Sequence, residues 1–376
     1  MIETIALCLL TIFTIYYIYF ITRIRLGLLS LQVAPPANIQ PIVSIIVAAR
    51  NEDKSIGQCL QALIRQTYPA HKYEIIIVDD GSTDMTVSIV KSFSQRFPNV
   101  RLLSLSAETE QEIGSKPMAM TKGIAQAIGE IILTTDADCI VPPRWVEIMI
   151  NHFDEHVAFV AGPVSEQSST RFFSKLEQME FLGLITTAAG LIGSGMPIIC
   201  NGANLAYRKN VFMLAGGFGQ NGTSNDDESL MNRIAKRNIG RIVFAPESDA
   251  VITTQSSNTV VAFIRQRIRW ANKRGRYEDK STFLTLVSLY LFFVSFTLTV
   301  ILIPLDPQLL LSVILVFGIK AIVDYFTLRS GARLFRQRFQ IPYFLIGELL
   351  HVPYIVIASA IGQLSTLHWK GRAIRK

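Results

Sequence analysis

The sequence predicts an α/β domain with a mostly parallel sheet, flanked by N- and C-terminal transmembrane helices. Between residues 41 and 278, short apolar runs rich in β-branched residues alternate with stretches of helical spacing, which indicates βαβ units. The flanking regions, 1–25 and 282–368, are dominated by long apolar stretches. Half of the 376 residues are hydrophobic and the mean hydropathy is +0.35, which is too apolar for an ordinary soluble enzyme.

The first apolar segment, 5–21, is followed by Arg23 and Arg25. A cleaved signal peptide would carry its basic residues before the apolar run and small residues after it. The reversed order predicts a retained signal-anchor helix within 1–25. Its N-terminus is expected outside, and the chain that follows is expected to enter the cytoplasm.

Strands and helices alternate in the first part of the middle domain. The run 43–48 is apolar on both faces, as expected of a strand buried in a parallel sheet. Asp84 lies near the expected N-cap of a helix. Ligands of such sheets bind beyond the carboxyl ends of the strands, so a site is expected in the loops there. The predicted strands are 43–48, 73–78, 100–105 and 130–135, and the predicted helices are 53–66, 84–97 and 116–128.

Apolar residues between 171 and 192 recur near helical spacing, with Lys175, Glu177 and Glu180 among them. The pattern predicts a helix but leaves its surroundings open. An amphipathic helix lying on the membrane and a buried core helix both fit it.

Three apolar segments follow the middle domain, at 283–305, 309–328 and 341–364. Lys320 and Asp324 lie one helical turn apart and are expected to pair, and Glu348 and His351 are expected to face a protein interior or a polar cavity. Four complete spans would put the basic tail, 369–376, outside the cell, which contradicts its cytoplasmic character. The last segment is therefore the candidate for a re-entrant or interfacial helix.

Three acidic clusters lie in loop contexts. Segment 79–84 (DDGSTD) follows the apolar run 75–78, Asp136 and Asp138 follow the run 131–135, and residues 226–228 (DDE) form the third. Carboxylates at strand ends attract a divalent cation, and hard Mg²⁺ or Mn²⁺ prefers carboxylate and phosphate oxygens. No G-x-G-x-x-G follows the first strand and the chain has no Walker lysine motif, which argues against dinucleotide and P-loop sites.

The net charge of +7 comes largely from basic residues beside apolar stretches, which favours contact with anionic membrane lipids. No basic stripe is interleaved with a nucleic-acid-binding module, so no nucleic acid partner is expected. The cysteines show no paired spacing, which indicates a reducing compartment without disulfides or a zinc site. They are Cys8, Cys59, Cys139 and Cys200.

Seven ordered motifs together resemble one family. They are VSIIVAARNE at 43–52, VDDGSTD at 78–84, Lys116 before a helix, DAD at 136–138, NGAN at 201–204, DDESL at 226–230 and QRIRW at 266–270. This set resembles the inverting, membrane-bound glycosyltransferases of family 2, which have the nucleotide-sugar-binding GT-A fold. The last motif is similar to the Q-x-x-R-W signature of cellulose, hyaluronan and poly-N-acetylglucosamine synthases. That signature also occurs in ceramide glucosyltransferase-like enzymes, which add one sugar to a lipid.

The resemblance implies roles on the donor side. Glu52 with Asp79 and Asp80 would hold the uracil and ribose of a nucleotide. Lys116 would approach the diphosphate, and Arg269 would contact it bidentately. Asp138, with Asp136, would bind Mg²⁺ or Mn²⁺. Simpler interpretations stay open, namely a first-turn helix carboxylate for Glu52 and a solvated side chain for Lys116.

On the other side of the reacting carbon, the resemblance makes Asp227 the general base. The family usually has Glu-Asp-x-x-Leu here, so Asp226 stands where a glutamate is expected, and Glu228 is a rival base if the register shifts by one residue. Gln266, Trp270 and Asp226 are expected on the acceptor side. Trp270 could instead be an ordinary interfacial tryptophan.

The resemblance implies an integral membrane enzyme of cell envelope glycan or glycolipid synthesis, expected in a bacterial membrane with its catalytic domain cytoplasmic. It would transfer a sugar from a nucleotide-sugar donor, expected to be a UDP-sugar, to a lipid-linked or glycan acceptor. A processive polysaccharide synthase is the alternative, although few membrane segments favour a short acceptor. A non-catalytic membrane assembly subunit would have lost acidic motif residues, and none is lost. A transporter is disfavoured because the membrane segments are few and show no inverted repeat.

Overall fold

A computed structural model describes residues 2–37, 40–105, 115–167, 170–218, 226–257, 259–271, 280–364, 368–369 and 372–373. Its centre is a seven-stranded sheet in the order β3-β2-β1-β4-β7-β5-β8. All neighbours pair in parallel except β7, which runs antiparallel to β4 and β5. The strands are β1 Val43–Ala49, β2 Tyr73–Asp79, β3 Val100–Ser104, β4 Ile131–Thr134, β5 Val157–Ala161, β7 Leu205–Arg208 and β8 Arg241–Phe244. The prediction of a mostly parallel sheet is confirmed.

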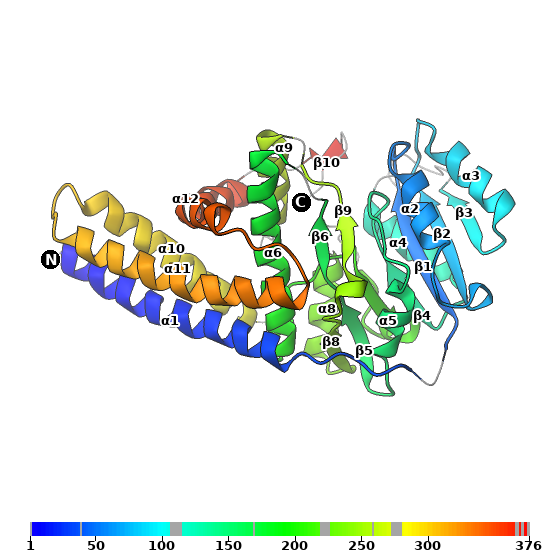
Figure 1. Cartoon of the computed structure of the whole chain (residues 1–376), viewed down its shortest axis with the longest axis horizontal. Helices are drawn as coiled ribbons and strands as arrows, with labels where there is room; N and C mark the ends of the chain where they lie inside the picture. The colour runs from blue at the N-terminus through cyan, green and yellow to red at the C-terminus, as the bar shows by residue number, and fades with distance from the viewer. Residues whose placement is uncertain are drawn as a thin grey trace.

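Helices cover both faces of this sheet (Figure 1). They are α2 Ile56–Leu63, α3 Thr86–Arg96, α4 Lys116–Gln126, α5 Trp145–Asn151, α7 Lys209–Leu214 and α8 Asp226–Lys236, with short 3₁₀ turns at Ala70–Lys72 and Ser248–Ala250. Helix α2 begins at Ile56, later than the predicted residue 53, and the backbone N–H of Asp53 donates to the carboxylate of Asp84 at 3.1 Å. A second, two-stranded ladder pairs β6 Val164–Glu166 with β9 Ile252–Thr254.

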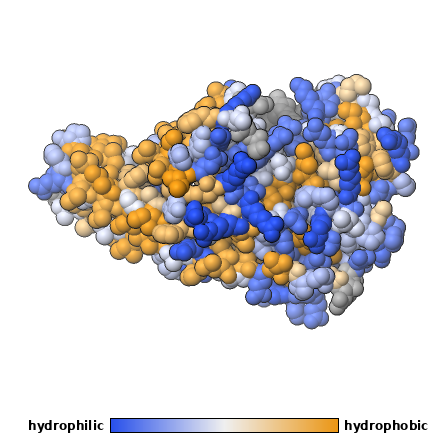
Figure 2. Space-filling view, in the orientation of Figure 1, coloured by the Kyte–Doolittle hydropathy of each residue, from blue (hydrophilic) through white to orange (hydrophobic). Residues whose placement is uncertain are grey.

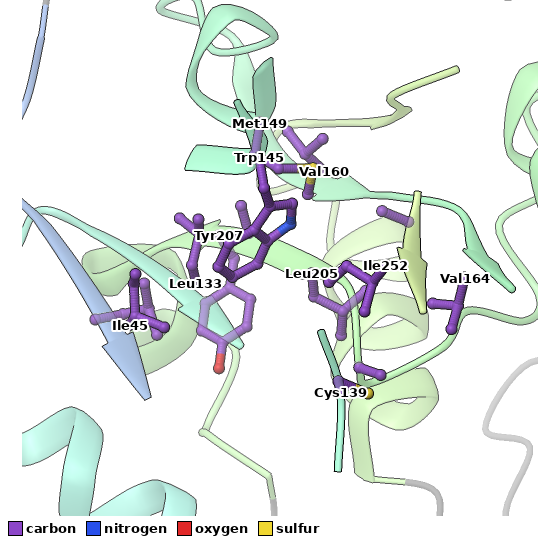
Figure 3. Close-up of a cluster of buried hydrophobic side chains, with 14 of the residues drawn as sticks. Ile45, Leu133, Cys139, Trp145, Met149, Val160, Val164, Leu205, Tyr207 and Ile252 are labelled. Carbon is purple, nitrogen blue, oxygen red and sulfur yellow. The ribbon is translucent and has the colours of Figure 1, made fainter. Parts of the chain in front are cut away.

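Trp145 anchors α5 on the sheet. Its indole is fully buried among strand residues that include Leu133, Leu205 and Tyr207 (Figure 3). The indole N–H donates to the side-chain carbonyl oxygen of Asn204 at 2.9 Å. The amide nitrogen of Asn204 donates in turn to the carbonyl oxygens of Pro163 and Ala250 at 2.8 and 2.9 Å. A buried polar group satisfied in this way holds the loop before β7 in one position.

Four of the described helices are long and apolar enough to cross a membrane. They are α1 Ile2–Ser30, α10 Lys280–Leu302, α11 Leu309–Leu334 and α12 Ile341–Leu364. The first three lie side by side along the long axis of the molecule and point away from the sheet, whereas α12 is seen nearly end-on and crosses them (Figure 1). Their outer surface is predominantly hydrophobic (Figure 2).

Helix α6, Phe172–Gly193, connects the sheet domain to the membrane helices. It packs against α1, α11 and α12, and its buried residues lie all around the helix. It is therefore a core helix, and the alternative of an amphipathic helix lying on the membrane is wrong. Glycines allow α1 to approach it closely, because a Cβ at Gly190 would lie 2.3 Å from the carbonyl oxygen of Ile24 and one at Gly193 would lie 2.2 Å from that of Gly27.

The close crossing of α1 and α6 makes Gly190→Ala a sensitive variant. The added methyl would meet backbone that cannot move aside, and overpacking of this kind typically costs about 1–3 kcal/mol. We expect a lower unfolding temperature of the detergent-solubilised protein. Gly183→Ala in the same helix is the matched control, because a Cβ there meets nothing within 4 Å. It should leave stability equal or raise it by about 0.5–1 kcal/mol; equal melting of both variants would contradict the crossing.

Charged groups buried within the membrane helices satisfy one another. The ammonium group of Lys320 donates to Asp324 at 2.8 Å and to Glu348 at 2.5 Å. The hydroxyl of Tyr17 donates to the carboxylate of Asp324 at 2.8 Å. The predicted pairing of Lys320 with Asp324 is confirmed, and the network joins α1, α11 and α12. Polar groups inside a membrane require such partners.

Candidate active site

The loops that carry the acidic residues meet at one edge of the sheet. Strand β1 lies between β2 and β4, and Ala49 pairs with Asp79 while Ile46 pairs with Thr134 in parallel register. The carboxyl ends of these strands therefore point the same way. Strand β7 is antiparallel to β4, with Leu205 opposite Thr134, so the segment 201–204 that precedes it reaches the same edge.

The loops after β1 and β2 brace each other. Asn51 adopts a positive φ of 53° and accepts the backbone N–H of Thr83 at 2.8 Å. The carboxylate of Asp79 accepts the backbone N–H of Ser82 at 3.2 Å, and Asp80 lies 3.7 Å from the guanidinium of Arg50. Both aspartates are buried. Asp79 thus shapes the loop from within, and its predicted contact with a nucleotide stays a prediction.

Glu52 lies at the rim of this loop pair. Its backbone N–H donates to the hydroxyl of Thr86 at 2.8 Å, and its carboxylate accepts the hydroxyl of Ser55 at 3.1 Å. The charge of this carboxylate, after burial and the charge of Asp136, contributes to the raised pKa of Asp138. The structure therefore brings Glu52 to the second acidic cluster rather than leaving it on a separate helix surface.

Asp136 and Asp138 form a compact acidic pair after β4. One ligand atom from each, together with the thiol of Cys139, falls within 4.8 Å of the others. Burial, followed by the charges of Asp136 and Glu52, raises the pKa of Asp138 to about 6. Crowded like charges of this kind are relieved by a bound cation. Cys139 is buried, and burial raises the pKa of its thiol well above the ordinary value.

Lys116 lies between the two acidic sites. Its ammonium group pairs with the carboxylate of Asp136. Burial opposes its charge, but Asp136 and then Asp227 outweigh that effect and raise the pKa of Lys116. Ser115 caps the helix that begins there by accepting the backbone N–H of Met118 at 3.3 Å. The cap fixes Lys116 in the first turn of α4, aimed at the strand ends.

Asp227 lies in the first turn of α8 and contacts the loop before β7. An ideal Cβ placed on Gly202 would lie 2.0 Å from Oδ2 of Asp227, so only glycine leaves room for the carboxylate. Burial raises the pKa of Asp227 to about 6, with Lys116 opposing and Asp136 adding to the shift. The sequence motif 201–204 gave Gly202 no role. The contact spans two loops distant in sequence, which no local pattern reveals.

Gln266 and Trp270, which were expected on the acceptor side, lie on α9, Val260–Ala271. Both side chains contact Arg267: the Gln266 side-chain oxygen accepts from its guanidinium at 2.6 Å, and the centroid of the Trp270 ring lies 4.2 Å from its Cζ atom. Trp270 also packs against the hydrophobic core. The side chains of Arg269 and Asp226 lie outside the described residues. The structure thus places Gln266 and Trp270 on one helix, and among the described residues no contact joins them to Asp136, Asp138 or Asp227.

A cavity of about 980 Å³ lies at the opposite edge of the sheet, lined by Pro41, Glu130, Val157, Arg241 and the linker 30–37. These residues precede or begin their strands, so the cavity opens away from the acidic loops. A much smaller pocket is lined by Asp138, Gln167 and Gln255 among others. The chemistry of the side chains, rather than the size of the hollow, therefore defines the candidate site.

Two family descriptions match the chain. Glycosyl transferase family 2 matches residues 44–213, and glycosyl transferase family group 2 matches residues 131–343, which is more than half of the chain. The chain is a family 2 glycosyltransferase. The motifs after β1, β2 and β4 lie within the first match and the Q-x-x-R-W segment lies within the second, so the resemblance noted from the motifs is confirmed.

Relatives of this glycosyltransferase include the beta-monoglucosyldiacylglycerol synthase of Trichormus variabilis, 26% identical over 358 residues, which are 88% of this chain and 71% of the relative. Glycosyltransferase AglE of Haloferax volcanii is 41% identical over 107 residues, which are 28% of this chain and 34% of that protein. The chain covers 34%, 48% and 54% of the first three relatives found.

Among solved structures, the glycosyltransferase is similar to the mannosyltransferase PcManGT of Pyrobaculum calidifontis in complex with GDP-Man and Mn²⁺. The TM-score is 0.63 at 22% identity, covering 97% of this chain and 99% of the other. This similarity shows a shared fold over nearly the whole length, membrane helices included. The expected GT-A fold is confirmed.

Proposed function

We propose that this enzyme transfers a sugar from a UDP-sugar to the hydroxyl of a membrane lipid at the cytoplasmic face, with inversion at the anomeric carbon. One observation carries the proposal: the acidic pair Asp136 and Asp138 and the separate carboxylate of Asp227 meet at one sheet edge, with Lys116 between them. Two acidic positions with different partners suit two tasks, namely neutralising a leaving diphosphate and removing a proton.

The residues fit a divalent metal ion. Asp136 and Asp138 offer carboxylate oxygens within the 4.8 Å group, and oxygen is the donor that Mg²⁺ and Mn²⁺ prefer. The thiol of Cys139 is buried and protonated at neutral pH, so the two aspartates are the proposed ligands. A bound cation would neutralise the diphosphate of the donor and so make it a better leaving group. PcManGT, which shares the fold, was solved with Mn²⁺.

Asp227 is the proposed general base. Its carboxylate would accept the proton of the acceptor hydroxyl as the oxygen of that hydroxyl bonds to the anomeric carbon and the bond from carbon to diphosphate breaks. Gly202 leaves the carboxylate free to face the acceptor. Lys116 would attract the diphosphate and hold it near Asp136. Attack from the side opposite the leaving group gives the inverted product in one displacement.

A lipid acceptor follows from the position of the membrane helices. Helix α6 packs on α1, α11 and α12 and contacts β6 and β8 of the sheet domain, which supports a site close to the membrane surface. The relative of Trichormus variabilis is named as a synthase of beta-monoglucosyldiacylglycerol, which makes diacylglycerol the first acceptor to test. The described residues include four helices of membrane-spanning length, which are few to enclose a channel for a growing polymer. This number favours a single sugar transfer over a processive synthase.

In this proposal α1, α10 and α11 cross the membrane and α12 lies along its cytoplasmic side. The crossing orientation of α12 in Figure 1 supports that placement. With three spans and an outside N-terminus, the catalytic domain and the tail are both cytoplasmic. A protease site added after residue 376 should then be cut in inside-out vesicles and protected in sealed cells. Cleavage in intact cells would contradict the arrangement.

Gly202→Ala is expected to reduce turnover without unfolding the protein. The new methyl would displace the Asp227 carboxylate, since the ideal Cβ position lies 2.0 Å from it. Misplacement of a catalytic group by about 1 Å can cost about 10²-fold in rate. Turnover and thermal unfolding measured on the same preparation test this, with Gly57→Ala as control because a Cβ there meets only one side-chain atom at 3.9 Å. Wild-type turnover in Gly202→Ala would argue against Asp227 as the general base.

A donor screen tests the proposed function as a whole. The detergent-solubilised full chain is mixed with dioleoylglycerol, Mg²⁺ or Mn²⁺, and one of a set of UDP- and GDP-sugars, and released nucleotide is measured. We expect release with UDP-sugars that depends on both the cation and the lipid. Nucleotide release with GDP-sugars alone would contradict a UDP-sugar donor. Polymer formation without lipid would contradict a lipid acceptor and favour a processive synthase.

A further inference from the structure

The QRIRW segment contains an arginine to which the family resemblance gives no role. Arg267 occupies the second position of the segment, and only 3% of its side-chain surface is exposed. A charged side chain is rarely buried so deeply without partners. Its contacts therefore define what it does for α9.

The guanidinium of Arg267 lies between a carboxylate on α6 and two aromatic rings of its own helix, α9. It forms a bidentate pair with the carboxylate of Glu180 on α6, in which Nε donates to Oε1 at 2.9 Å and Nη2 donates to the other oxygen. Its Cζ atom lies 4.2 Å from the centroid of the Trp270 ring and 4.5 Å from that of the Phe263 ring. Fork-to-carboxylate pairs fix orientation as well as distance, and stacked guanidinium groups add cation–π attraction.

We propose that Arg267 and Glu180 are positioning residues that orient the acceptor-side face of α9. Their ion pair ties α9, which packs on α12, to α6, and the guanidinium over the Trp270 ring holds that ring in place. The same guanidinium donates to the side-chain oxygen of Gln266 at 2.6 Å. Gln266 and Trp270 therefore both contact the buried guanidinium of Arg267. This inference rests on the proposed function, in which Trp270 and Gln266 receive the acceptor.

Burial excludes the alternative that Arg267 binds substrate itself. Its donors are already directed at Glu180 and Gln266. Arg265, two residues earlier on the same helix, is exposed. The chain therefore presents two arginines on one helix that differ in burial, which supplies a matched pair for experiment.

The pair also reaches the membrane helix α12 and the sheet domain. The hydroxyl of Tyr354 on α12 lies 3.5 Å from the carboxylate of Glu180, and its ring packs near Phe263. On the other side, the Glu177 carboxylate accepts the backbone N–H of Ser257 at 3.1 Å, in the segment that leads into α9. Contacts from α6, α12 and the 255–257 segment thus converge on the start and middle of α9.

Two further glutamates, Glu166 and Glu177, lie near the Arg267–Glu180 ion pair. Glu166 and Glu177 each have one buried oxygen without a hydrogen-bond partner among the described residues. Burial, followed by the charge of Glu177, raises the pKa of Glu166 to about 9, which favours a protonated Glu166 at neutral pH. The next residue, Gln167, lines the small pocket with Asp138.

The proposal is tested with Arg267→Met, Arg267→Lys and Glu180→Gln in the full chain, with Arg265→Met as control. Dioleoylglycerol in phosphatidylcholine vesicles is the acceptor probe, and transfer to water without lipid reports donor activation alone. We expect acceptor kcat/KM to fall by about 10²-fold in Arg267→Met, as for misplaced substrate-positioning groups. Donor KM and the transfer to water should change little. Arg267→Lys should be intermediate, because it keeps the charge and loses the fork.

A spectroscopic readout separates this inference from the proposed function. In a Trp369→Phe background, Trp145 is fully buried, so acrylamide quenching reports Trp270. Quenching should rise in Arg267→Met and stay at the parent level in Arg265→Met, whether or not sugar transfer is detected. Equal quenching in all variants would overturn the positioning role of Arg267 even if the enzyme is active. A parallel loss of donor and acceptor kinetics would also overturn it, since a general structural defect predicts that result.

Discussion

Asp227→Asn should lower turnover by about 10²–10⁴-fold while leaving the affinity for the nucleotide-sugar donor nearly unchanged. That range is what a positioned general base typically contributes. Asparagine keeps the size of the side chain, so the packing against Gly202 survives. The amide cannot accept the proton of the acceptor hydroxyl, however, and the loss should therefore appear in kcat. Donor binding by calorimetry and single-turnover kinetics on one preparation measure the two effects.

The pH profile supplies a second signature of the same residue. Burial raises the pKa of Asp227 to about 6, against Lys116 and with Asp136. A base acts only when deprotonated, so wild-type activity should be full above this pH and fall as pH drops through 6. Glu228→Gln is the control, because Glu228 is the base if the motif register is shifted by one. Loss of activity in Glu228→Gln with an active Asp227→Asn would transfer the role to Glu228.

Asp138→Ala should abolish cation-dependent donor binding, the second large effect. Loss of an outer-shell partner alone typically lowers metal affinity by about 10–100-fold, so loss of a direct ligand should cost more than about 100-fold. The crowding that raises the pKa of Asp138 to about 6 would also vanish, since burial, Asp136 and Glu52 act on this carboxylate. The apo protein should therefore be no less stable than the parent.

The measurement is a calorimetric titration of UDP into the full chain with and without Mn²⁺. The parent should bind more tightly with the cation, and Asp138→Ala should bind equally in both conditions. Asp249→Ala serves as control, since Asp249 pairs with Arg144 on the surface at 3.5 Å. Cation-enhanced binding that persists in Asp138→Ala would remove this residue from the metal site.

Much of the sheet follows from local sequence. The apolar runs that became β1, β2 and β4 are buried over nearly their whole length, and such runs leave few alternatives to a parallel sheet. The antiparallel strand β7 was not predicted. It has only four residues, which is too short for a periodicity to stand out, and its place between β4 and β5 depends on distant pairing.

The candidate site was predicted in part. Strand order brings together the acidic loops, and the rule that ligands bind at the carboxyl ends of parallel strands anticipated that edge. The packing of Gly202 on Asp227 and the burial of Arg267 were not anticipated. Both depend on contacts between segments far apart in sequence. From sequence alone, a basic residue near a membrane segment is expected to be solvated. Arg267 is buried instead, because Glu180 supplies a charged partner.

Helix α6 shows why composition alone left two interpretations. Its apolar residues are spread around the helix, so no single face marks a membrane or a core. The glycines decide the matter: Gly190 and Gly193 admit α1 at backbone contact, and Gly331 of α11 packs against Thr186. Small residues at helix crossings permit close approach, and their partners become visible only in three dimensions.

The stereochemistry of the first product tests the central claim most directly. If Asp227 activates the acceptor while the diphosphate leaves from the opposite side, one displacement must invert the anomeric carbon. Proton NMR of the glycolipid formed from an α-linked UDP-sugar should then show only the β-anomer from the earliest time points. An α-linked first product would contradict the single displacement and, with it, the division of tasks between Asp227 and the Asp136–Asp138 pair.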